Sequence, residues 1–339
     1  NLLRVADNAH GMDLDELTKA MKLSSAPADK TGRSEFGMGM KSAACWFSPR
    51  WTVRTSSLGE PVEKTVNFDI ARIVRDQIEE LTVEERRVTA GEHYTEVSLD
   101  RLYKAPQSKT IQKIQEHLAS IYRVFLREEA LELVFNDQPL GYETPRILVA
   151  PYYRTPDAVA VTWRKNIEFD FGLGLRVEGF AALRERASTT HAGFALFRRG
   201  RLIQGSVDEG YRPEAVFGKS NSYRYQRLFG ELHLTGFSVS HTKDGFVWEE
   251  HEETFLELLK EHLNSKPFPL LDQAEEYRAR PRRDEIRSGV ESATERTAEV
   301  IERDVPPVLA RLETEPPAPE PQPTPSASDA PLISRPGIG

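Results

Sequence analysis

The sequence predicts an α+β protein with more than one domain, and three observations support this. Runs that alternate apolar and polar residues, as half-buried strands do, occur at residues 51–56, 62–70 and 94–99, between segments with helical spacing. Strand-like runs dominate from residue 129 to about 265, and past residue 306 the chain is rich in Pro, Ala, Ser and Glu. A length of 339 residues agrees with two or three domains.

Composition narrows the class of protein. The net charge is −8, so bulk charge does not favour nucleic acid, although a local basic patch is compatible with it. The single cysteine excludes an intrachain disulfide and predicts a reducing, cytoplasmic location. This residue, Cys45, follows two alanines and precedes Trp46, which favours a buried structural thiol. No apolar run approaches the roughly 20 residues that span a bilayer, so we expect no membrane partner.

The first motif is Val-Ala-Asp-Asn-Ala-His-Gly-Met at residues 5–12. Apolar residues lead into Asp7, Asn8 and Gly11, which are turn formers, so a strand should end here. A carboxylate at a strand end can accept a hydrogen bond, and a nearby glycine lets the backbone approach a flat ligand. Taken alone, such a motif is most often only an ordinary turn.

The second motif is Gly-Arg-Ser-Glu-Phe-Gly-Met-Gly-Met-Lys-Ser at residues 32–42, a glycine-rich loop that opens a helix. Successive backbone N–H groups and the helix N-terminus can surround an anion, and Lys41 adds a charge suited to phosphate. The motif lacks the ending of a Walker A loop, and it does not follow a strand as a dinucleotide fingerprint does. A purely structural loop is the alternative.

The two motifs in this order resemble the nucleotide-binding boxes of the GHKL ATPases, which include type II topoisomerase subunits, ninety-kilodalton heat-shock chaperones, mismatch-repair ATPases, histidine kinases and MORC proteins. Residues 7–12 resemble the Asp-Asn-Gly-x-Gly-Met box, with Ala9 in place of a glycine, and residues 37–42 resemble the lid box in its MORC-type form. Thr95 matches the threonine that closes the adenine pocket, although Tyr94 stands where glycine is usual, and an ordinary strand threonine is the alternative.

The resemblance implies a set of ATP contacts. Asp7 would bind the adenine amino group, with Asn8, Gly11, Met12 and Thr95 forming the base pocket. The residues implied at the phosphates are Gly37, Met38, Gly39, Met40, Lys41 and Ser42.

The resemblance also implies a Bergerat-type α/β sandwich over residues 1–128, a mobile lid at residues 24–32, and ATP bound with Mg²⁺. The family places a helix with the catalytic Glu and the Mg²⁺-binding Asn before the first box. Because the sequence starts at Asn1 without Met, we expect a fragment whose general base and metal ligand lie upstream, and we assign no metal ligand within it.

Residues 129–265 are expected to form a β-rich domain similar to the transducer domain of these ATPases. Residues 238–248 resemble a loop in which a lysine reaches the γ-phosphate, and this assigns a catalytic role to Lys243. A turn lysine beside Asp244 and Gly245 is the alternative. A basic turn at residues 197–203 could contact nucleic acid, or it could be a solvated tip. An aromatic and basic run at residues 223–229 could also contact nucleic acid, or it could pack between domains. A charged helical segment (266–305) and a disordered tail (306–339) would follow.

Three functions remain open from the sequence. The favoured one is an ATP-dependent conformational clamp that forms a homodimer on ATP and hydrolyses it, MORC-like, with DNA or another protein as partner. The second is a nucleotide-gated interaction module or chaperone-like protein with little turnover. The third is a binding protein without a nucleotide site.

Overall fold

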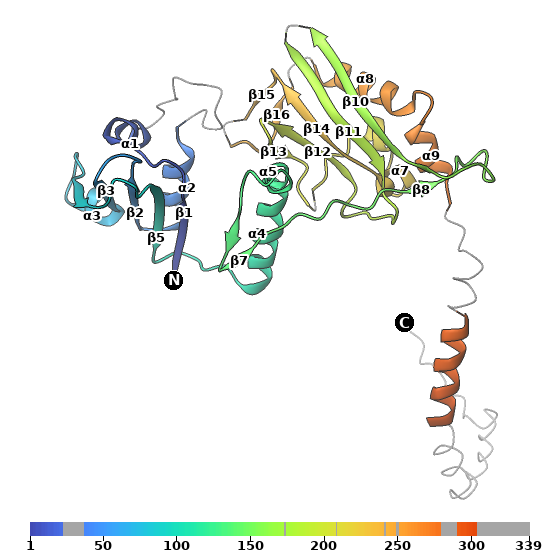
Figure 1. The fold of residues 1–339 in the computed structure, drawn as a ribbon, viewed down its shortest axis with the longest axis horizontal. Coiled ribbons are helices and arrows are strands. Elements are labelled where there is room, and N and C mark those ends of the chain that lie inside the picture. The colour runs from blue at the N-terminus through green and yellow to red at the C-terminus, as the bar shows by residue number, and fades with distance from the viewer. Residues whose placement is uncertain are drawn as a thin grey trace, which may run out of the picture. The chain divides into compact units, whose positions relative to one another are not determined.

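The computed structural model describes residues 1–22, 37–172, 174–207, 209–240, 242–248, 251–278 and 290–303 (Figure 1). The expected lid at residues 24–32 and the expected tail from residue 306 lie outside the described residues. The chain divides into two compact units, Asn1–Tyr277 and Arg278–Gly339. Two five-stranded sheets organise the first unit.

The first sheet is antiparallel throughout, with strand order β1-β5-β2-β3-β4. Its strands are β1 (Leu2–Asp7), β2 (Arg50–Ser56), β3 (Val62–Asp69), β4 (Val83–Arg87) and β5 (Tyr94–Asp100). The helices of this region are α1 (Leu14–Met21), α2 (Gly39–Phe47) and α3 (Ile70–Arg75). The three strands expected at residues 51–56, 62–70 and 94–99 are confirmed as β2, β3 and β5.

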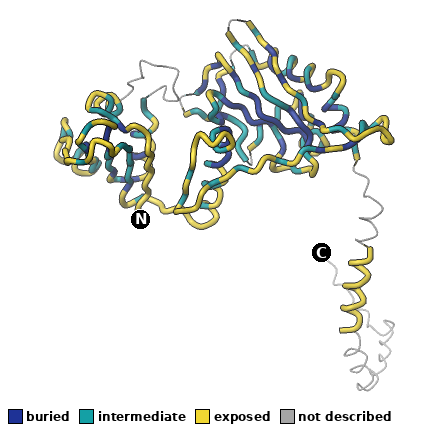
Figure 2. The backbone as a smooth tube through the Cα atoms, in the orientation of Figure 1, coloured by how far each residue is buried: buried dark blue, intermediate teal, exposed yellow. Residues whose placement is uncertain are grey.

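One face of the first sheet is apolar, and α1 and α2 contribute to the core on it. Because side chains alternate along a strand, Trp51, Val53 and Leu99 point to the same face, where Leu17 of α1 and Ala44 of α2 join them. The opposite face carries charged groups, including Glu63, whose carboxylate binds Arg86 through two hydrogen bonds of 3.0 and 2.9 Å. The edge strand β1 is exposed along its whole length (Figure 2).

A capping box fixes the start of α1 directly after the first motif. The Asp13 carboxylate accepts a hydrogen bond from the Glu16 N–H at 2.7 Å, and the Glu16 carboxylate accepts one from the Asp13 N–H at 3.0 Å. Two N–H groups that a helix N-terminus leaves without partners are thereby satisfied. The loop between Asp7 and α1 is therefore held at both of its ends.

The second sheet has strand order β10-β11-β14-β12-β13, and only its β12–β14 pair is parallel. Its strands are β10 (Arg164–Gly172), β11 (Leu175–Leu183), β12 (Gly193–Arg198), β13 (Arg201–Gln204) and β14 (Leu228–Thr235). Three short hairpins accompany it: β6 (Val134–Phe135) with β7 (Gln138–Pro139), β8 (Val149–Ala150) with β9 (Val161–Thr162), and β15 (Ser238–Val239) with β16 (Phe246–Val247).

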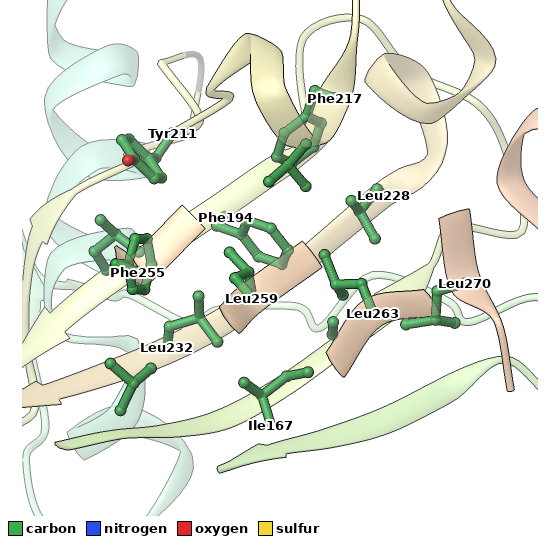
Figure 3. Packing of buried hydrophobic residues seen from close by; sticks show 14 of the residues in the cluster. Ile167, Phe194, Tyr211, Phe217, Leu228, Leu232, Phe255, Leu259, Leu263 and Leu270 are labelled. Carbon is green, nitrogen blue, oxygen red and sulfur yellow. The ribbon is translucent and has the colours of Figure 1, made fainter. Parts of the chain in front are cut away.

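The main core of the protein lies on one face of the second sheet (Figure 3). Ile167, Phe194 and Leu232 of the sheet contact a helical layer that includes Phe255 and Leu259. The helices on this side are α6 (Glu214–Phe217), α7 (Tyr223–Arg227), α8 (Glu252–Asn264) and α9 (Leu270–Glu276). Helix α9 lies beyond the expected domain end at residue 265, and its residues Leu270, Leu271 and Ala274 are buried in the same core.

The opposite face of the second sheet is covered in part by α4 (Ser108–Ile121) and α5 (Arg123–Arg127). Ala195, Phe197 and Leu202 pack there against Ile121 and Val124. These two helices precede the expected boundary at residue 128 and nevertheless bury their apolar side against the second sheet. The result is a layered arrangement of helices, sheet and helices.

Cys45 corrects one sequence expectation, because it is exposed and not buried. Helix α2 turns Lys41 and Ala44 toward the protein interior, and these two residues, three positions apart, occupy its buried side. Cys45 and Trp46 face outward, with 79% of Trp46 exposed. Residues 290–303 form a helix whose residues are all exposed. In the described part of the chain, no helix has both the length and the apolar character needed to cross a bilayer.

Candidate functional site

Three polar side chains form a row across neighbouring strands of the first sheet. Asp7 at the end of β1 lies directly opposite Thr95 of β5, and Thr95 lies directly opposite Thr55 of β2. Directly paired residues of antiparallel strands have their side chains on the same face. The sheet therefore brings together the two adenine-pocket residues expected from the sequence, Asp7 and Thr95, and adds Thr55 to them.

The hydrogen bonds of Thr55 determine how the Thr95 hydroxyl is oriented. The Thr55 Oγ1 donates to the Tyr94 carbonyl at 3.0 Å and accepts from the Met12 N–H at 2.9 Å. A hydroxyl has one hydrogen, so the 3.1 Å contact between Thr55 and Thr95 requires Thr95 to be the donor. Thr95 is left with acceptor lone pairs only, beside the carboxylate of Asp7.

Asp7 shapes its own turn and keeps one oxygen available. Its Oδ1 accepts a hydrogen bond from the Ala9 N–H at 3.0 Å, which is the geometry of an Asx turn. Its other carboxylate oxygen has no hydrogen-bond partner within the part of the chain that the structure describes, and the residue is exposed. Asn8 is exposed in the same turn.

Gly11 lies where no other residue fits. Its φ angle is +75°, and a Cβ built on it would lie 1.8 Å from the Ser56 carbonyl oxygen. The backbone of the first motif therefore runs in direct contact with the end of β2. This close approach aligns the Met12 N–H with the Thr55 hydroxyl.

Further contacts fix the loop, and the sequence alone did not single out their residues. The Leu58 N–H donates to the His10 carbonyl at 2.8 Å, and His93 Nδ1 lies 2.8 Å from the Ala9 carbonyl. Since a carbonyl can only accept, the His93 hydrogen must be on Nδ1. The register of β2 and β5 is the signal that could have identified Thr55, and it becomes visible only when the strands are paired.

The glycines of the second motif open α2. Gly37 has a φ angle of +62°, and a Cβ on Gly39 would meet nothing within 4 Å. Met38 is the N-cap, and no side chain caps the helix there. Met40 packs against the same apolar cluster as Met12, so both motifs rest on one core. Ser42 is exposed on the first turn, and its N–H donates to the Met38 carbonyl at 3.0 Å.

Lys41 is more buried than a phosphate-binding lysine is expected to be, with 7% of the residue exposed. Its ammonium group donates to the carbonyls of Ala20, Lys22 and Gly37 at 2.5, 2.8 and 2.7 Å. An ammonium has three hydrogens, so these carbonyls use all of its donors. Burial lowers the pKa of Lys41 from its ordinary value. In this conformation Lys41 ties the end of α1 to the start of α2.

Lys243 lies at the tip of the β15–β16 hairpin. Its φ angle is +57°, in the left-handed region that side chains seldom adopt, and its N–H donates to the Ser240 carbonyl at 3.0 Å. Ser240 and Asp244 close the tip, because the Ser240 hydroxyl donates to the Asp244 carboxylate at 2.6 Å. The hairpin therefore presents Lys243 on a tightly held turn.

The aromatic and basic run at residues 223–229 takes part in packing. Arg224 forms an ion pair with Glu275 of α9 at 3.3 Å, and Arg227 donates to the carbonyls of Arg184 and Glu185 at 3.3 and 3.4 Å. The guanidinium of Arg212 lies 4.6 Å from the centre of the Tyr225 ring. These contacts support packing beside the second sheet as the role of the run. We call residues 108–277, which form and cover this sheet, the second region.

The residues that the structure describes contain no group of three or more His, Cys, Asp or Glu side chains that could hold a metal ion. We assign none of the described residues to a metal ion.

Comparison with known proteins agrees with the resemblance of the two motifs. A search of curated proteins finds no match. Residues 1–95, which include Asp7, the residues of α2 and Thr95, match the model of the histidine kinase-, DNA gyrase B- and HSP90-like ATPase family, so the N-terminal region of the chain is GHKL ATPase-like.

Proposed function

We propose that this chain binds ATP at the row of Asp7, Thr95 and Thr55. The observation that carries the proposal is the orientation of the Thr95 hydroxyl, which donates to Thr55 and so leaves two acceptors, Asp7 and Thr95, side by side. The exocyclic amino group of adenine has two N–H donors and fits such a pair. Gly11 would let the backbone pass close to the flat base, because without a side chain the loop can lie directly against β2.

We assign the phosphates to the N-terminus of α2. The open space around Gly39 and the absence of a side-chain cap leave backbone N–H groups for an anion, and the helix dipole favours negative charge at this end. Gly37, Met38, Gly39, Met40 and Ser42 would contribute through the backbone or, for Ser42, its hydroxyl. Lys41 would reach a phosphate only by giving up at least one of its three carbonyl partners.

Mg²⁺ would accompany ATP as in the GHKL family, but no described residue is assigned to it. Hydrolysis would be attack of water on the γ-phosphate, assisted by positioning and positive charge. Lys243 at the hairpin tip is our candidate for contact with the γ-phosphate, which would make the conformation of the second region depend on the nucleotide. We propose no general base.

The proposed biological role is an ATP-dependent, MORC-like clamp that acts in the cytoplasm, dimerises on binding ATP and is reset by hydrolysis, with DNA or another protein as partner. The second candidate is a nucleotide-gated interaction module with little turnover. The three hydrogen bonds from Lys41 to backbone carbonyls favour this candidate. In these bonds the ammonium group stabilises the contact between α1 and α2, and it does not stabilise the charge of a phosphoryl group in transfer.

The test is thermal unfolding with and without Mg-ATP. Binding raises the unfolding free energy by about 2.7 kcal/mol at a hundredfold excess over Kd. The shift should disappear in Asp7→Asn, whose amide would present a donor to the adenine amino group, and persist in Asp15→Asn, which removes the same charge from an exposed position of α1. An ATP shift that survives Asp7→Asn would refute the assignment of the adenine site.

A further inference from the structure

A cavity of about 580 Å³ lies on the face of the second sheet that α4 and α5 cover only in part. One wall is helical and includes Ser120 and Arg123, and the floor includes Ala195 of β12 and Glu231 of β14. The extended segment at residues 142–146 forms another wall. The volume is that of a typical small-molecule site. All of these elements belong to the second region, and none belongs to the nucleotide site proposed above.

A buried ion pair, Glu231 with Arg123, lies in the interior of this cavity. Glu231 is 4% exposed and binds two arginines: its Oε1 lies 3.1 Å from Arg123 Nε, and its Oε2 lies 2.9 Å from Arg127 Nη2. Arg123 is itself 6% exposed. Arg127 is not part of the cavity lining and 41% of its side chain is exposed, so water solvates its charge. Because Glu231 is shared between Arg123 and Arg127, the buried Arg123 has no carboxylate of its own.

Arg123 is also held rigidly. Its Nη1 donates to the Tyr142 hydroxyl at 2.7 Å, and its guanidinium lies 4.7 Å from the Tyr142 ring centre and 4.9 Å from that of Phe197. A guanidinium clamped between two rings loses little conformational entropy when it binds a ligand. The interior arginine is therefore preorganised for an anion.

Two more arginines line the same cavity. Arg184 donates to the carbonyls of Arg186 and His191 at 3.3 and 3.1 Å, and burial lowers its pKa from the ordinary value, which means that its charge is poorly solvated. Arg146 is exposed, and its guanidinium has no partner among the residues that the structure describes. Among the described residues, only the glutamates of the lining bring negative charge to this cavity.

Ser120 provides an independent sign of a ligand. The residue is completely buried, lines the cavity, and its hydroxyl has no hydrogen-bond partner among the described residues. Buried polar groups in folded proteins almost always have a partner, so an unpartnered hydroxyl at a cavity wall calls for one that the described residues do not supply. Ser120 lies at the end of α4 and Arg123 at the start of α5, and both residues line the cavity.

The acidic residues of the lining limit what can bind. Glu231 is compensated by its two arginines, whereas Glu116 and Glu143 are exposed. Their charges would repel a long polyanion such as nucleic acid, but would act little on a compact anion in the interior, since water screens exposed charges. The cavity therefore suits a small, singly or doubly charged anion.

We propose that this cavity binds a small molecule with a compact oxyanion, a carboxylate or a phosphate, held by Arg123, Arg184 and Arg146 with the Ser120 hydroxyl as an additional donor. Arginine is suited to this role because its planar N–H groups match the oxygens of both anions. This proposal does not depend on ATP binding at Asp7.

The test is titration of the full chain with inorganic phosphate and, separately, with succinate, followed by calorimetry at constant ionic strength set with chloride. We expect at least one of the two anions to bind with a Kd in the millimolar range or below. The anion with the lower Kd shows whether the site prefers a phosphate or a carboxylate. Arg146→Ala should weaken binding about tenfold, the loss expected for one charge-assisted contact. Arg154→Ala is the matched control, because this exposed arginine lies over Tyr153 and outside the cavity.

Ser120→Ala separates ligand binding from a structural role. Removing a buried hydroxyl that has no partner should leave the melting temperature of the ligand-free protein unchanged or raise it, while binding becomes about threefold weaker or more. The proposal is overturned if neither anion binds above the chloride control at 20 mM. Binding that is indifferent to both Arg146→Ala and Ser120→Ala, as expected for phosphate held at α2, would overturn it equally.

Discussion

The hydroxyls of Thr55 and Thr95 lie 3.1 Å apart on neighbouring strands, and Thr95 must be the donor between them. This relationship makes the proposed base pocket a surface of acceptors, formed by Thr95 and the Asp7 carboxylate. Guanine carries a carbonyl oxygen where adenine carries its amino group. If the base binds at this row as we propose, the orientation of one hydroxyl makes Thr95 a determinant of base selectivity.

We predict that ATP binds at least about 100-fold more tightly than GTP, because the guanine oxygen would face two acceptors without a hydrogen between them. The measurement is the shift in melting temperature across a concentration series of each nucleotide. Thr95→Ser, which keeps the hydroxyl, should preserve the preference. Equal affinity for the two nucleotides would show that the base does not lie at this row.

Thr55 and Thr95 should differ in what their loss does to the fold. Thr55→Val leaves the partly buried Met12 N–H and the Thr95 hydroxyl without their acceptor, so it should lower the unfolding free energy by about 1–3 kcal/mol. Thr95→Val removes only a donor, because Thr55 keeps its bonds to Met12 and Tyr94, and its cost should be smaller. Chemical denaturation of both variants checks the order, and a larger effect of Thr95→Val would contradict the hydrogen-bond assignment.

Two glycines in the nucleotide motifs should respond in opposite directions to alanine. Gly11→Ala would place a methyl group 1.8 Å from the Ser56 carbonyl oxygen at a φ angle of +75°, so we expect destabilisation by at least about 2 kcal/mol. Gly39→Ala meets nothing within 4 Å on the first turn of α2, so stability should stay unchanged or rise by up to about 1 kcal/mol.

The same pair tests the phosphate assignment. If ATP phosphates lie against the backbone at the start of α2, the methyl group of Gly39→Ala should weaken ATP binding even though the protein itself is not weakened. Melting with and without Mg-ATP measures both quantities on one sample. Unchanged ATP affinity in Gly39→Ala would place the phosphates elsewhere.

Sequence reasoning succeeded where information is local. Alternation identified β2, β3 and β5, and the motif at residues 5–12 identified the strand end at Asp7. Thr55 was missed because a threonine in an alternating strand carries no sign of its partners, and only the register across β5 shows them. Cys45 was placed wrongly for a related reason: composition says that α2 is apolar, but only tertiary packing shows which side is buried.

Lys41 illustrates the same limit at the site. A lysine after a glycine-rich loop suggests phosphate, and the sequence contains nothing that would bring the carbonyls of Ala20 and Lys22 to it. These acceptors are available because the last carbonyls of a helix lack intrahelical partners, and the end of α1 meets the start of α2 in the folded chain. The outcome depends on a contact between two helices, which the pattern of either helix does not encode.

Lys41→Met should therefore destabilise the ligand-free protein by about 1–3 kcal/mol at neutral pH, since three carbonyls lose a charged donor. The pH dependence has a definite sign. Burial lowers the pKa of Lys41 in the folded state below the 10.5 of the unfolded chain, so the unfolded state binds more protons between these two values. The stability advantage of the wild type over Lys41→Met should grow as the pH rises through that interval. Denaturation curves of both proteins at several alkaline pH values measure it. A constant difference would show that burial does not shift the pKa of Lys41, and a shrinking one that the folded state raises it.

His233 provides a pH dependence on the acid side. It lies directly opposite Phe197 on the neighbouring parallel strand, and the two rings stack with their centres 5.0 Å apart. Burial lowers the pKa of His233 below its ordinary value of 6.5. Glu231 and Glu178 oppose this shift without reversing it, and Arg127 and Arg123 add to it. The folded protein therefore holds the ring neutral at pH values where the unfolded chain already binds a proton.

The sign follows from proton binding. Between the lowered folded pKa and 6.5 the unfolded state binds more protons, so stability rises with pH in this window and is lost as the pH falls through it. His233→Phe keeps the stacked ring and removes the titration, so its unfolding free energy should fall less than that of the wild type between pH 7 and the acid end of the window. Urea denaturation of both proteins at matched ionic strength is the measurement. Parallel curves for the two proteins would show that His233 is not the group whose protonation opposes folding, and would return attention to the carboxylates of the sheets.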